Sequence, residues 1–156
     1  MKIEFHHINY VSTNVDELNK FYIEVLGLTK VPAENFVRTE ADKNNGYDGN
    51  IKFVTDGSMQ MHLAERDLTV AKKNKLHINP VERGHIAFRT DDIRKFKDML
   101  DEKHIPYADY GTKFSQEWHQ VFFYDPEGNI IEVHQVIKWF HTLLTIIYQL
   151  WLVIVL

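Results

Sequence analysis

The 156-residue chain contains no cysteine, which excludes both a disulfide framework and a thiolate metal site. It also lacks any run of basic residues, and a formal net charge of −4 gives no basis for a nucleic-acid partner. Residues 1–6 lack the apolar core of a signal peptide, so we expect cytoplasmic localisation. The remaining composition is that of a globular protein, 44% hydrophobic and 26% charged, with nine histidines as its unusual feature.

A short segment near the N-terminus recurs in the middle of the chain. The pair His7-Ile8 is followed by Tyr10, and the pair His85-Ile86 is followed at the same spacing by Phe88. Each copy reads as a strand that leads into an Asn or Asp helix cap and an amphipathic helix. The repeat predicts an α+β fold in which two paired βαβββ modules form one domain and enclose a site between them. We expect that domain at 1–136 and its modules at about 3–64 and 83–136.

Periodicity and turn residues place the elements of each module. We expect helices at 15–26 and from 93 to 100, a polar loop at 42–50, a linker at 65–80, and strands at 3–11, 36–39, 51–55, 59–64, 84–90, 105–110, 118–124 and 130–135. Strict alternation along the first strand predicts that His6 points away from His7.

The segment 137–156 lies outside the repeat and forms a hydrophobic C-terminal tail. Its last 18 residues, 139–156, include 14 apolar residues and no charge. That length is at the short limit for a membrane-spanning helix, so membrane association through 139–156 is one interpretation. A partner-binding helix, a non-native tail and a helix packed on the domain are the alternatives.

Each module also closes with a strand that carries one ligand-type residue between apolar neighbours, His62 in the first and Glu132 in the second. Together with His7 and His85 they form a set of four candidate metal ligands. Symmetric pairing of the modules predicts that all four meet. Three imidazoles and one carboxylate suit a borderline divalent ion such as Ni, Co, Zn, Fe or Mn, and the residue types do not decide which.

Several segments around these residues carry a family resemblance. They are Val15 to Leu28 with Phe21-Tyr22 and Leu26-Gly27-Leu28, Gln60-Met61-His62-Leu63, Ile78-Asn79-Pro80, Gly84-His85-Ile86-Ala87-Phe88 and Phe123 to Glu132. In order and spacing the chain from 3 to 136 resembles the vicinal oxygen chelate superfamily of glyoxalases, bleomycin-resistance proteins and extradiol dioxygenases, and within it small glyoxalase I-like proteins. The resemblance implies a cup-shaped sheet around a divalent metal, with ligands at His7, His62, His85 and Glu132, and a homodimer.

The first functional hypothesis is a metal-dependent glyoxalase-like lyase or isomerase that acts on a small 2-oxo or hydroxy-carbonyl compound. The ion acts as a Lewis acid and stabilises an enediolate, with Glu132 as the catalytic base. Asn9, His119 and His134 are candidate substrate contacts. The resemblance places Val11 and Val81 where glyoxalase I has its glutathione-binding arginines, which argues against glutathione.

Two alternatives remain at this point. An extradiol-type dioxygenase needs an Fe(II) triad of two histidines and one carboxylate, and His62 as a fourth ligand takes a position that catechol and oxygen need. A drug-binding or fosfomycin-resistance-type module uses the same cup, but a fosfomycin transferase needs three ligands and a basic pocket, for which only Arg89 and Lys113 are available.

Overall fold

The computed structural model describes residues 1–32, 36 and 38–137. The first half contains β1 (Ile3–Ser12), α1 (Val15–Glu24), β2 (Thr29–Lys30), α2 (Glu40–Asn45), β3 (Ile51–Thr55) and β4 (Gln60–Glu65). After α3 (Val70–Asn74) the second half contains β5 (His85–Thr90), α4 (Ile93–Glu102), β6 (Tyr107–Gly111), β7 (Trp118–Tyr124) and β8 (Ile130–Val136). The βαβββ order therefore occurs twice, as the repeat predicts, with α2 as an addition to the first copy.

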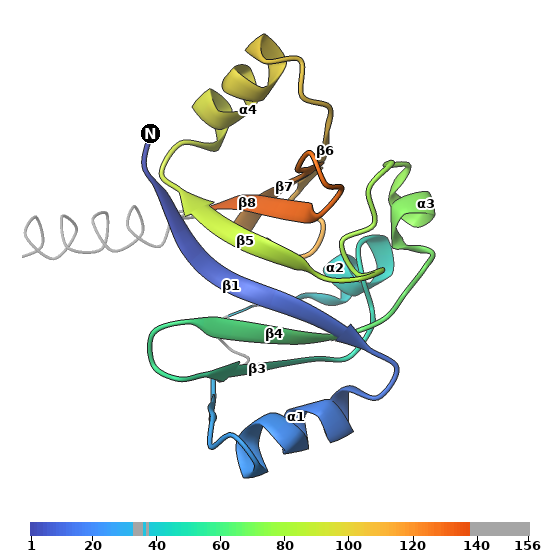
Figure 1. Cartoon of the computed structure of the whole chain (residues 1–156). Helices are drawn as coiled ribbons and strands as arrows, with labels where there is room; N and C mark the ends of the chain where they lie inside the picture. The colour runs from blue at the N-terminus through green and yellow to red at the C-terminus, as the bar shows by residue number, and fades with distance from the viewer. Residues whose placement is uncertain (33–35, 37, 138–156) are drawn as a thin grey trace, which may run out of the picture.

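The eight strands form one mixed, open sheet in the order β2-β3-β4-β1-β5-β8-β7-β6 (Figure 1). In each module the first strand pairs in parallel with the last, β1 with β4 and β5 with β8. The two modules join where β1 and β5 pair antiparallel, so their strand orders mirror each other about this seam. This arrangement confirms the predicted α+β fold of paired modules.

Side-chain caps fix where the two long helices begin. The Asn14 carboxamide oxygen accepts from the Glu17 amide at 3.1 Å, and the Asp92 carboxylate accepts from the Lys95 amide at 2.9 Å. Each cap satisfies an amide that lacks a partner in the first helical turn. The Asn and Asp helix caps that the sequence predicts are therefore Asn14 and Asp92.

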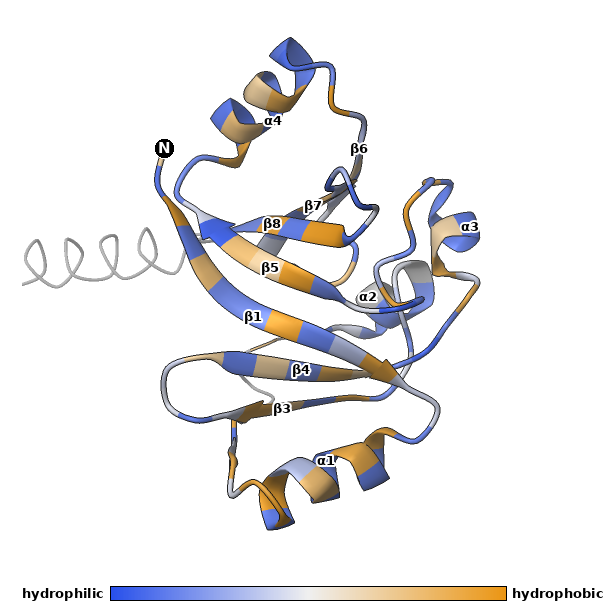
Figure 2. Cartoon of the chain, viewed as in Figure 1, coloured by the Kyte–Doolittle hydropathy of each residue, from blue (hydrophilic) through white to orange (hydrophobic). Residues whose placement is uncertain are grey.

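Helices α1 and α4 pack on the outer face of the sheet, and Figure 2 shows hydrophobic and hydrophilic residues alternating along β1, β4 and β5. Between α1 and the sheet the core contains Val15, Val54 and Leu63, and between α4 and the sheet it contains Phe96, Leu100, Val121 and Val133. Because alternate residues of a strand face opposite ways, the residues between these face the inner side of the cup.

A β-bulge in β1 overturns one prediction. The pairing of β1 with β5 shifts register between Phe5 and His7, so the extra residue, His6, is unpaired. A bulge breaks the alternation of side chains. His6 therefore does not point away from His7: their Nδ1 atoms lie 2.8 Å apart.

Two loop predictions and one strand prediction are also wrong. Segment 65–80 is not a bare linker, because it contains α3 and buries Val70 and Ile78 completely in the core. The polar segment 42–50 is partly helical, since α2 runs from Glu40 to Asn45. Among the described residues of 36–39 none is in a strand; instead the two-residue β2 pairs with β3.

The predictions for the hydrophobic tail fall on residues 138–156, outside the described part of the chain. Within the described part, none of the helices combines the length and apolar character that a membrane span requires.

Candidate functional site

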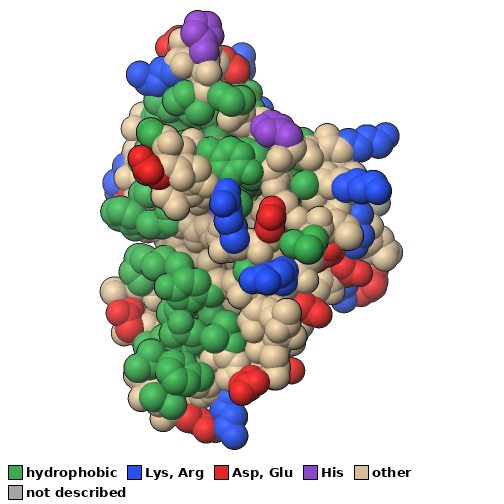
Figure 3. Space-filling model, turned by 45° about the vertical axis from the view of Figure 1, so that its right-hand side comes forward, with side chains coloured by type: hydrophobic (Ala, Val, Ile, Leu, Met, Phe, Trp, Pro, Cys, Tyr) green, Lys and Arg blue, Asp and Glu red, His purple; other side chains and the backbone are tan. Residues whose placement is uncertain are grey.

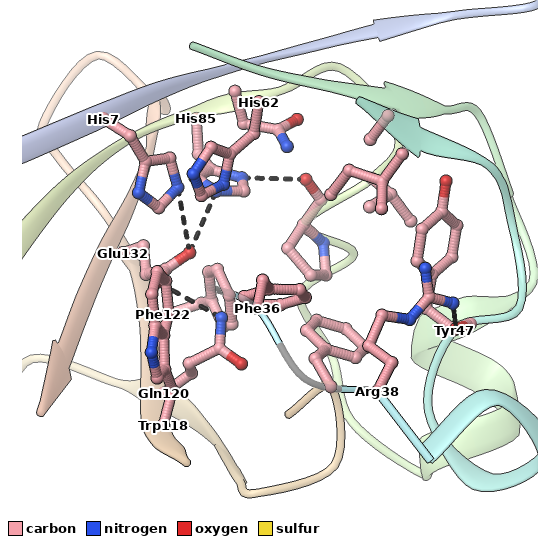
Figure 4. A pocket seen from close by; sticks show the side chains of 16 residues that line it. His7, Phe36, Arg38, Tyr47, His62, His85, Trp118, Gln120, Phe122 and Glu132 are labelled. Carbon is pink, nitrogen blue, oxygen red and sulfur yellow. Dashed lines mark hydrogen bonds and ion pairs between the residues drawn. The ribbon is translucent and has the colours of Figure 1, made fainter. Parts of the chain in front are cut away.

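The inner face of the sheet carries the polar residues that the sequence singles out. Strands β1, β4, β5 and β8 contribute His7, His62, His85 and Glu132, one residue from each, and Figure 4 shows the four at one end of a pocket. All four side chains are buried or nearly so; Glu132 is 1% exposed. The seam between β1 and β5 is therefore what brings the two modules' residues together.

Three of the four residues converge on one point. Glu132 Oε2 lies 2.9 Å from His85 Nε2 and 3.7 Å from His7 Nε2. Within the described residues, His7, His85 and Glu132 form one of two groups whose potential ligand atoms are mutually close enough to hold a metal ion. His62 is outside that group. Its ring stacks on that of His7, with centroids 3.6 Å apart, and its Nε2 lies 3.4 Å from Gln60 Oε1.

The tautomer of His85 is set by the backbone. His85 Nδ1 lies 2.9 Å from the carbonyl oxygen of Pro80, and a carbonyl only accepts, so Nδ1 carries the hydrogen. The lone pair of a neutral ring is then on Nε2. This buried atom faces Glu132 Oε2 but has no hydrogen-bond partner. Two lone pairs at 2.9 Å repel each other unless a cation, a proton or a metal ion, lies between them.

The carboxylate of Glu132 is held from its other side. Its Oε1 accepts from Gln120 Nε2 at 3.2 Å and lies 2.9 Å from His134 Nδ1. Burial acts to raise the pKa of Glu132, but His7, His134 and His85 outweigh it and hold the pKa well below its usual range. The carboxylate is therefore ionised at neutral pH. Its Oε2, which Gln120 and His134 do not contact, points toward His7 and His85.

Burial keeps His7 and His62 in the neutral form. Burial is the largest cause that lowers the pKa of His7 and of His62 well below the usual value, and neighbouring imidazoles add to it. Neutral imidazole is the form that binds a metal ion. An ionised carboxylate beside neutral imidazoles is thus the protonation state that a metal site requires.

Sequence reasoning missed a second layer behind this centre. Arg89 Nη2 lies 2.6 Å from His6 Nε2, and Arg89 Nε lies 3.4 Å from His134 Nε2. Burial, followed by the charges of His134 and Arg89, lowers the pKa of His6 to about 3. The adjacent pair His6-His7 is visible in the sequence, but only the bulge turns both rings inward.

The pocket in front of the centre is small: its cavity volume is about 30 Å³, which is room for about one water molecule. Apolar side chains form most of its wall: Phe36, Ile51, Ala64, Pro80, Val81, Phe114, Trp118 and Phe122. Asn9 lines it, as predicted, and its buried Oδ1 has no hydrogen-bond partner. Arg38, which sequence reasoning also missed, lines the far end and donates to the Gly49 carbonyl at 3.1 Å.

The other two predicted substrate contacts lie elsewhere. His119 sits between Trp118 and Gln120 on β7, so alternation turns it to the outer face, where its Nε2 lies 2.8 Å from Asp109 Oδ1. His134 does share a face with Glu132 but is completely buried, and its ring stacks on Trp118 with centroids 4.3 Å apart. His134 therefore supports Glu132 from behind the pocket.

The residues of the centre fit a divalent metal ion. Two or three imidazoles with one carboxylate are the donors that Ni, Co, Zn, Fe and Mn share. The unpartnered Nε2 of His85 is a lone pair aimed at the carboxylate, and the Pro80 carbonyl fixes that ring from behind, as outer partners do in metal sites. Gln120 does the same for Glu132.

Comparisons with known proteins agree with the fold. The sequence model of the Glyoxalase/Bleomycin resistance protein/Dioxygenase superfamily matches residues 4–133. The Arabidopsis thaliana protein "Glyoxylase I 4" is 26% identical over 132 residues, 82% of this chain and 68% of that protein. A hypothetical protein of Bacillus halodurans C-125 superposes with a TM-score of 0.63 at 16% identity, over 88% of this chain and 97% of that one. Methylmalonyl-CoA epimerase of Mycobacterium tuberculosis gives 0.62 at 15% identity, over 86% and 89%.

Proposed function

The chain belongs to the Glyoxalase/Bleomycin resistance protein/Dioxygenase superfamily, and we propose that it is a divalent-metal-dependent lyase or isomerase of glyoxalase type. The observation that carries the proposal is the convergence of His7, His85 and Glu132 at the buried end of an apolar pocket. The relative named for glyoxylase I supports the same class of reaction.

In this proposal His7, His85 and Glu132 hold the ion, and His62, stacked on His7, is the candidate fourth ligand. The ion supplies a Lewis acid that polarises a carbonyl oxygen of the substrate. Glu132 is the base that takes a proton from the carbon beside that carbonyl. Gln120 holds Oε1 of Glu132, so that Oε2 remains directed at the reacting side of the pocket.

The pocket indicates a small substrate with an oxygen-rich or anionic end. Its small cavity and its apolar wall suit a compact 2-oxo or hydroxy-carbonyl compound. Among the described lining residues Arg38 is the single permanent cation, and it lies at the end of the pocket away from Glu132. Val81 lines the wall with an apolar side chain, which is consistent with a substrate other than a glutathione adduct.

One observation favours a second candidate function. The residues that converge are two histidines and one carboxylate, while His62 lies outside the group. Two histidines and a carboxylate with open positions are the Fe(II) triad of oxygenases. An extradiol-type dioxygenase is therefore our alternative proposal. The sequence argues against it because His62 is expected as a fourth ligand, and that objection is weaker now that His62 lies outside the group.

The test is proton exchange in D₂O. Protein loaded with Ni, Co, Zn, Mn or Fe(II) is incubated with 2-oxoaldehydes, with the hemithioacetal of methylglyoxal and with 2-hydroxy aldehydes, and NMR follows product and deuterium at the carbon beside the carbonyl. We expect exchange with wild type and with Arg94→Met, an exposed control, and its loss in His85→Ala. No exchange with any substrate, together with oxygen uptake on catechols in the Fe(II) form, replaces the proposal by the alternative.

We also propose that the protein is a homodimer. Phe21, Val25 and Leu26, on and just after α1, are each about half exposed or more. Figure 3 shows hydrophobic side chains gathered over the part of the surface where α1 lies. Contiguous exposed apolar residues of this kind mark protein interaction sites.

A further inference from the structure

The cup contains a second group of histidines, which includes two that are not ligands in the proposed reaction, His6 and His134. Within the described residues, His6, His7 and His134 also place potential ligand atoms within 4.8 Å of one another. Three neutral imidazoles are good ligands for zinc, nickel or copper. Because the two groups share His7, the chain has two adjacent candidate metal sites. A structural feature must therefore favour one site over the other.

Arg89 is the feature that separates the two groups. It extends from β5 into the second group and directs N–H bonds at two rings, Nη2 at His6 Nε2 (2.6 Å) and Nε at His134 Nε2 (3.4 Å). Arginine has no acceptor and keeps its charge in proteins, so both imidazole Nε2 atoms must accept. The guanidinium also lies over the Trp118 ring at 5.8 Å, a second contact that fixes its position.

The contacts of Arg89 determine where the hydrogens of both rings lie. A neutral imidazole that accepts at Nε2 carries its hydrogen on Nδ1. His6 Nδ1 then donates to His7 Nδ1 at 2.8 Å, and His134 Nδ1 presents its hydrogen to Glu132 Oε1 at 2.9 Å. In each ring Arg89 therefore occupies Nε2 and a hydrogen occupies Nδ1. The hydrogen of His6 is bonded to His7, whereas that of His134 lies beside Glu132 Oε1 without forming an aligned hydrogen bond.

The first group is arranged in the opposite way. The Pro80 carbonyl takes the hydrogen of His85 at Nδ1, which leaves Nε2 with an unpartnered lone pair facing Glu132. His7 belongs to both groups; its Nδ1 accepts from His6, so its own hydrogen is on Nε2 toward Glu132, and an ion that binds at Nε2 must release this proton to solvent. His85 therefore offers a free lone pair in the first group, whereas His6 and His134 offer none in the second.

We propose that Arg89 is a specificity-determining residue that keeps His6 and His134 out of metal coordination, so that a divalent ion occupies only the group of His7, His85 and Glu132. This inference rests on the proposed function for the identity of the occupied group. Two parts of it can be tested without any activity: which ring nitrogens of His6 and His134 carry hydrogen, and whether these two rings bind a metal ion.

The first experiment measures the hydrogens directly. Long-range ¹H–¹⁵N NMR of metal-free protein distinguishes a protonated from an unprotonated ring nitrogen in each histidine. We expect Nδ1–H in His6 and His134 of wild type and of the exposed control Arg94→Met, and loss of that preference in Arg89→Met. A hydrogen on Nε2 of His6 or His134 in wild type contradicts the proposal.

The second experiment measures which rings bind. Zn²⁺ added to wild type should perturb the ring nitrogens of His85 and leave those of His6 and His134 as they were, whereas in Arg89→Met those of His6 and His134 should move. In a His85→Ala background, Arg89→Met should tighten Zn²⁺ binding by about tenfold, the lower end of the effect of an outer partner. Arg89→Lys, which keeps the charge but cannot reach both rings, should behave like Arg89→Met.

The outcomes separate the two proposals. If Zn²⁺ fails to bind at His85 and Glu132 in wild type, the proposed function fails, yet the hydrogen positions in metal-free protein still test Arg89. If Zn²⁺ shifts the ring-nitrogen resonances of His6 and His134 in wild type as it does in Arg89→Met, Arg89 does not keep these rings out of metal coordination. This inference is then overturned, even where the enzyme is active. Should Arg89→Met fail to fold, the wild-type spectra and Arg89→Lys carry the test.

Discussion

At the scale of single residues, the site is a buried acid held by its neighbours. Glu132 has one oxygen occupied by Gln120 and close to His134, and the other directed toward His7 and His85. Burying a carboxylate costs free energy, and pairing it inside the protein often does not repay the whole cost of removing it from water. The cluster around Glu132 therefore lowers the folding stability of the metal-free protein. A metal ion bound between Glu132 and the imidazoles removes that cost, since it binds the folded state only.

Gln120 gives the first prediction at this scale. Gln120→Leu keeps the approximate size of the side chain and removes the N–H that Glu132 Oε1 accepts. Because outer partners orient metal ligands, we expect metal affinity to fall by roughly 10- to 100-fold. Isothermal titration with Zn²⁺ measures it, with Gln116→Leu on the exposed β6–β7 connection as control. Equal affinity of the Gln120→Leu variant and wild type shows that Gln120 does not position Glu132.

The neutral histidines give a second prediction, on pH. The pKa of His6 is about 3 in the folded protein, and those of His7 and His62 are well below normal, against about 6.5 when unfolded. Below pH 6.5 the unfolded chain therefore binds protons that the folded chain does not, and stability falls as pH falls. Each histidine contributes about 1.4 kcal/mol between pH 7.5 and 5.5.

Urea unfolding of the metal-free protein at the two pH values measures this loss, which is about 4 kcal/mol if the three histidines act independently. His62→Gln should remove about a third of it, whereas His104→Gln, an exposed control, should remove none. A free energy of unfolding that does not change between pH 7.5 and 5.5 contradicts burial of these rings in the neutral form.

At the scale of elements, the seam between β1 and β5 positions the site. Gly84 precedes His85 with φ of +84°, and a Cβ placed there lies 2.3 Å from the Asn9 carbonyl oxygen. Glycine at this position lets the two strands approach and brings His85 beside His7. The strand and the repeat are predictable from the sequence, but this close approach is not, because it depends on pairing between distant segments.

Gly84→Ala tests the seam, with Gly128→Ala as the matched control. Both glycines have positive φ, but a Cβ at Gly128 has nothing within 4 Å. We expect Gly128→Ala to cost about 1 kcal/mol for the backbone alone and Gly84→Ala about 3 kcal/mol, because the carbonyl must also move. Thermal unfolding measures both. Equal losses indicate that the seam tolerates a side chain.

The bulge in β1 shows where element-level prediction fails. Alternation predicts the inward direction of His7, Asn9, Glu132 and His134 correctly, and the outward direction of His6 wrongly. The extra residue leaves no mark in the hydrophobic pattern here, because His6 and the next residue, His7, are of the same polar type. The same limit applies to α3, whose buried Val70 is visible only through tertiary packing.

At the scale of the whole molecule, duplication explains why so much of the fold could be predicted. Two copies of one unit fix the mirrored strand order, and the order brings the first and last strands of each copy to the centre. Four candidate ligands could therefore be named from sequence, although only three converge. What the sequence alone could not provide was the environment: the contacts of Arg89 behind the histidines, and the place of Arg38 across the pocket, depend on residues far apart in the chain.

The exposed apolar face of α1 gives a prediction at this scale. Phe21→Glu places a charge in that face and should shift the protein from dimer to monomer in sedimentation velocity, whereas Lys20→Glu, beside it on an exposed position, should not. A wild-type protein that sediments as a monomer at all concentrations refutes the dimer and leaves the metal centre unaffected.

The most direct test of the central claim is metal content. Wild-type protein, dialysed against a mixture of Ni, Co, Zn, Mn and Fe(II) and analysed by mass spectrometry, should retain one equivalent of divalent metal per chain. Glu132→Gln and His85→Ala should retain less than about a tenth of that, while Arg94→Met retains all of it. Equal retention by all four proteins, or none by wild type, contradicts a metal centre at His7, His85 and Glu132.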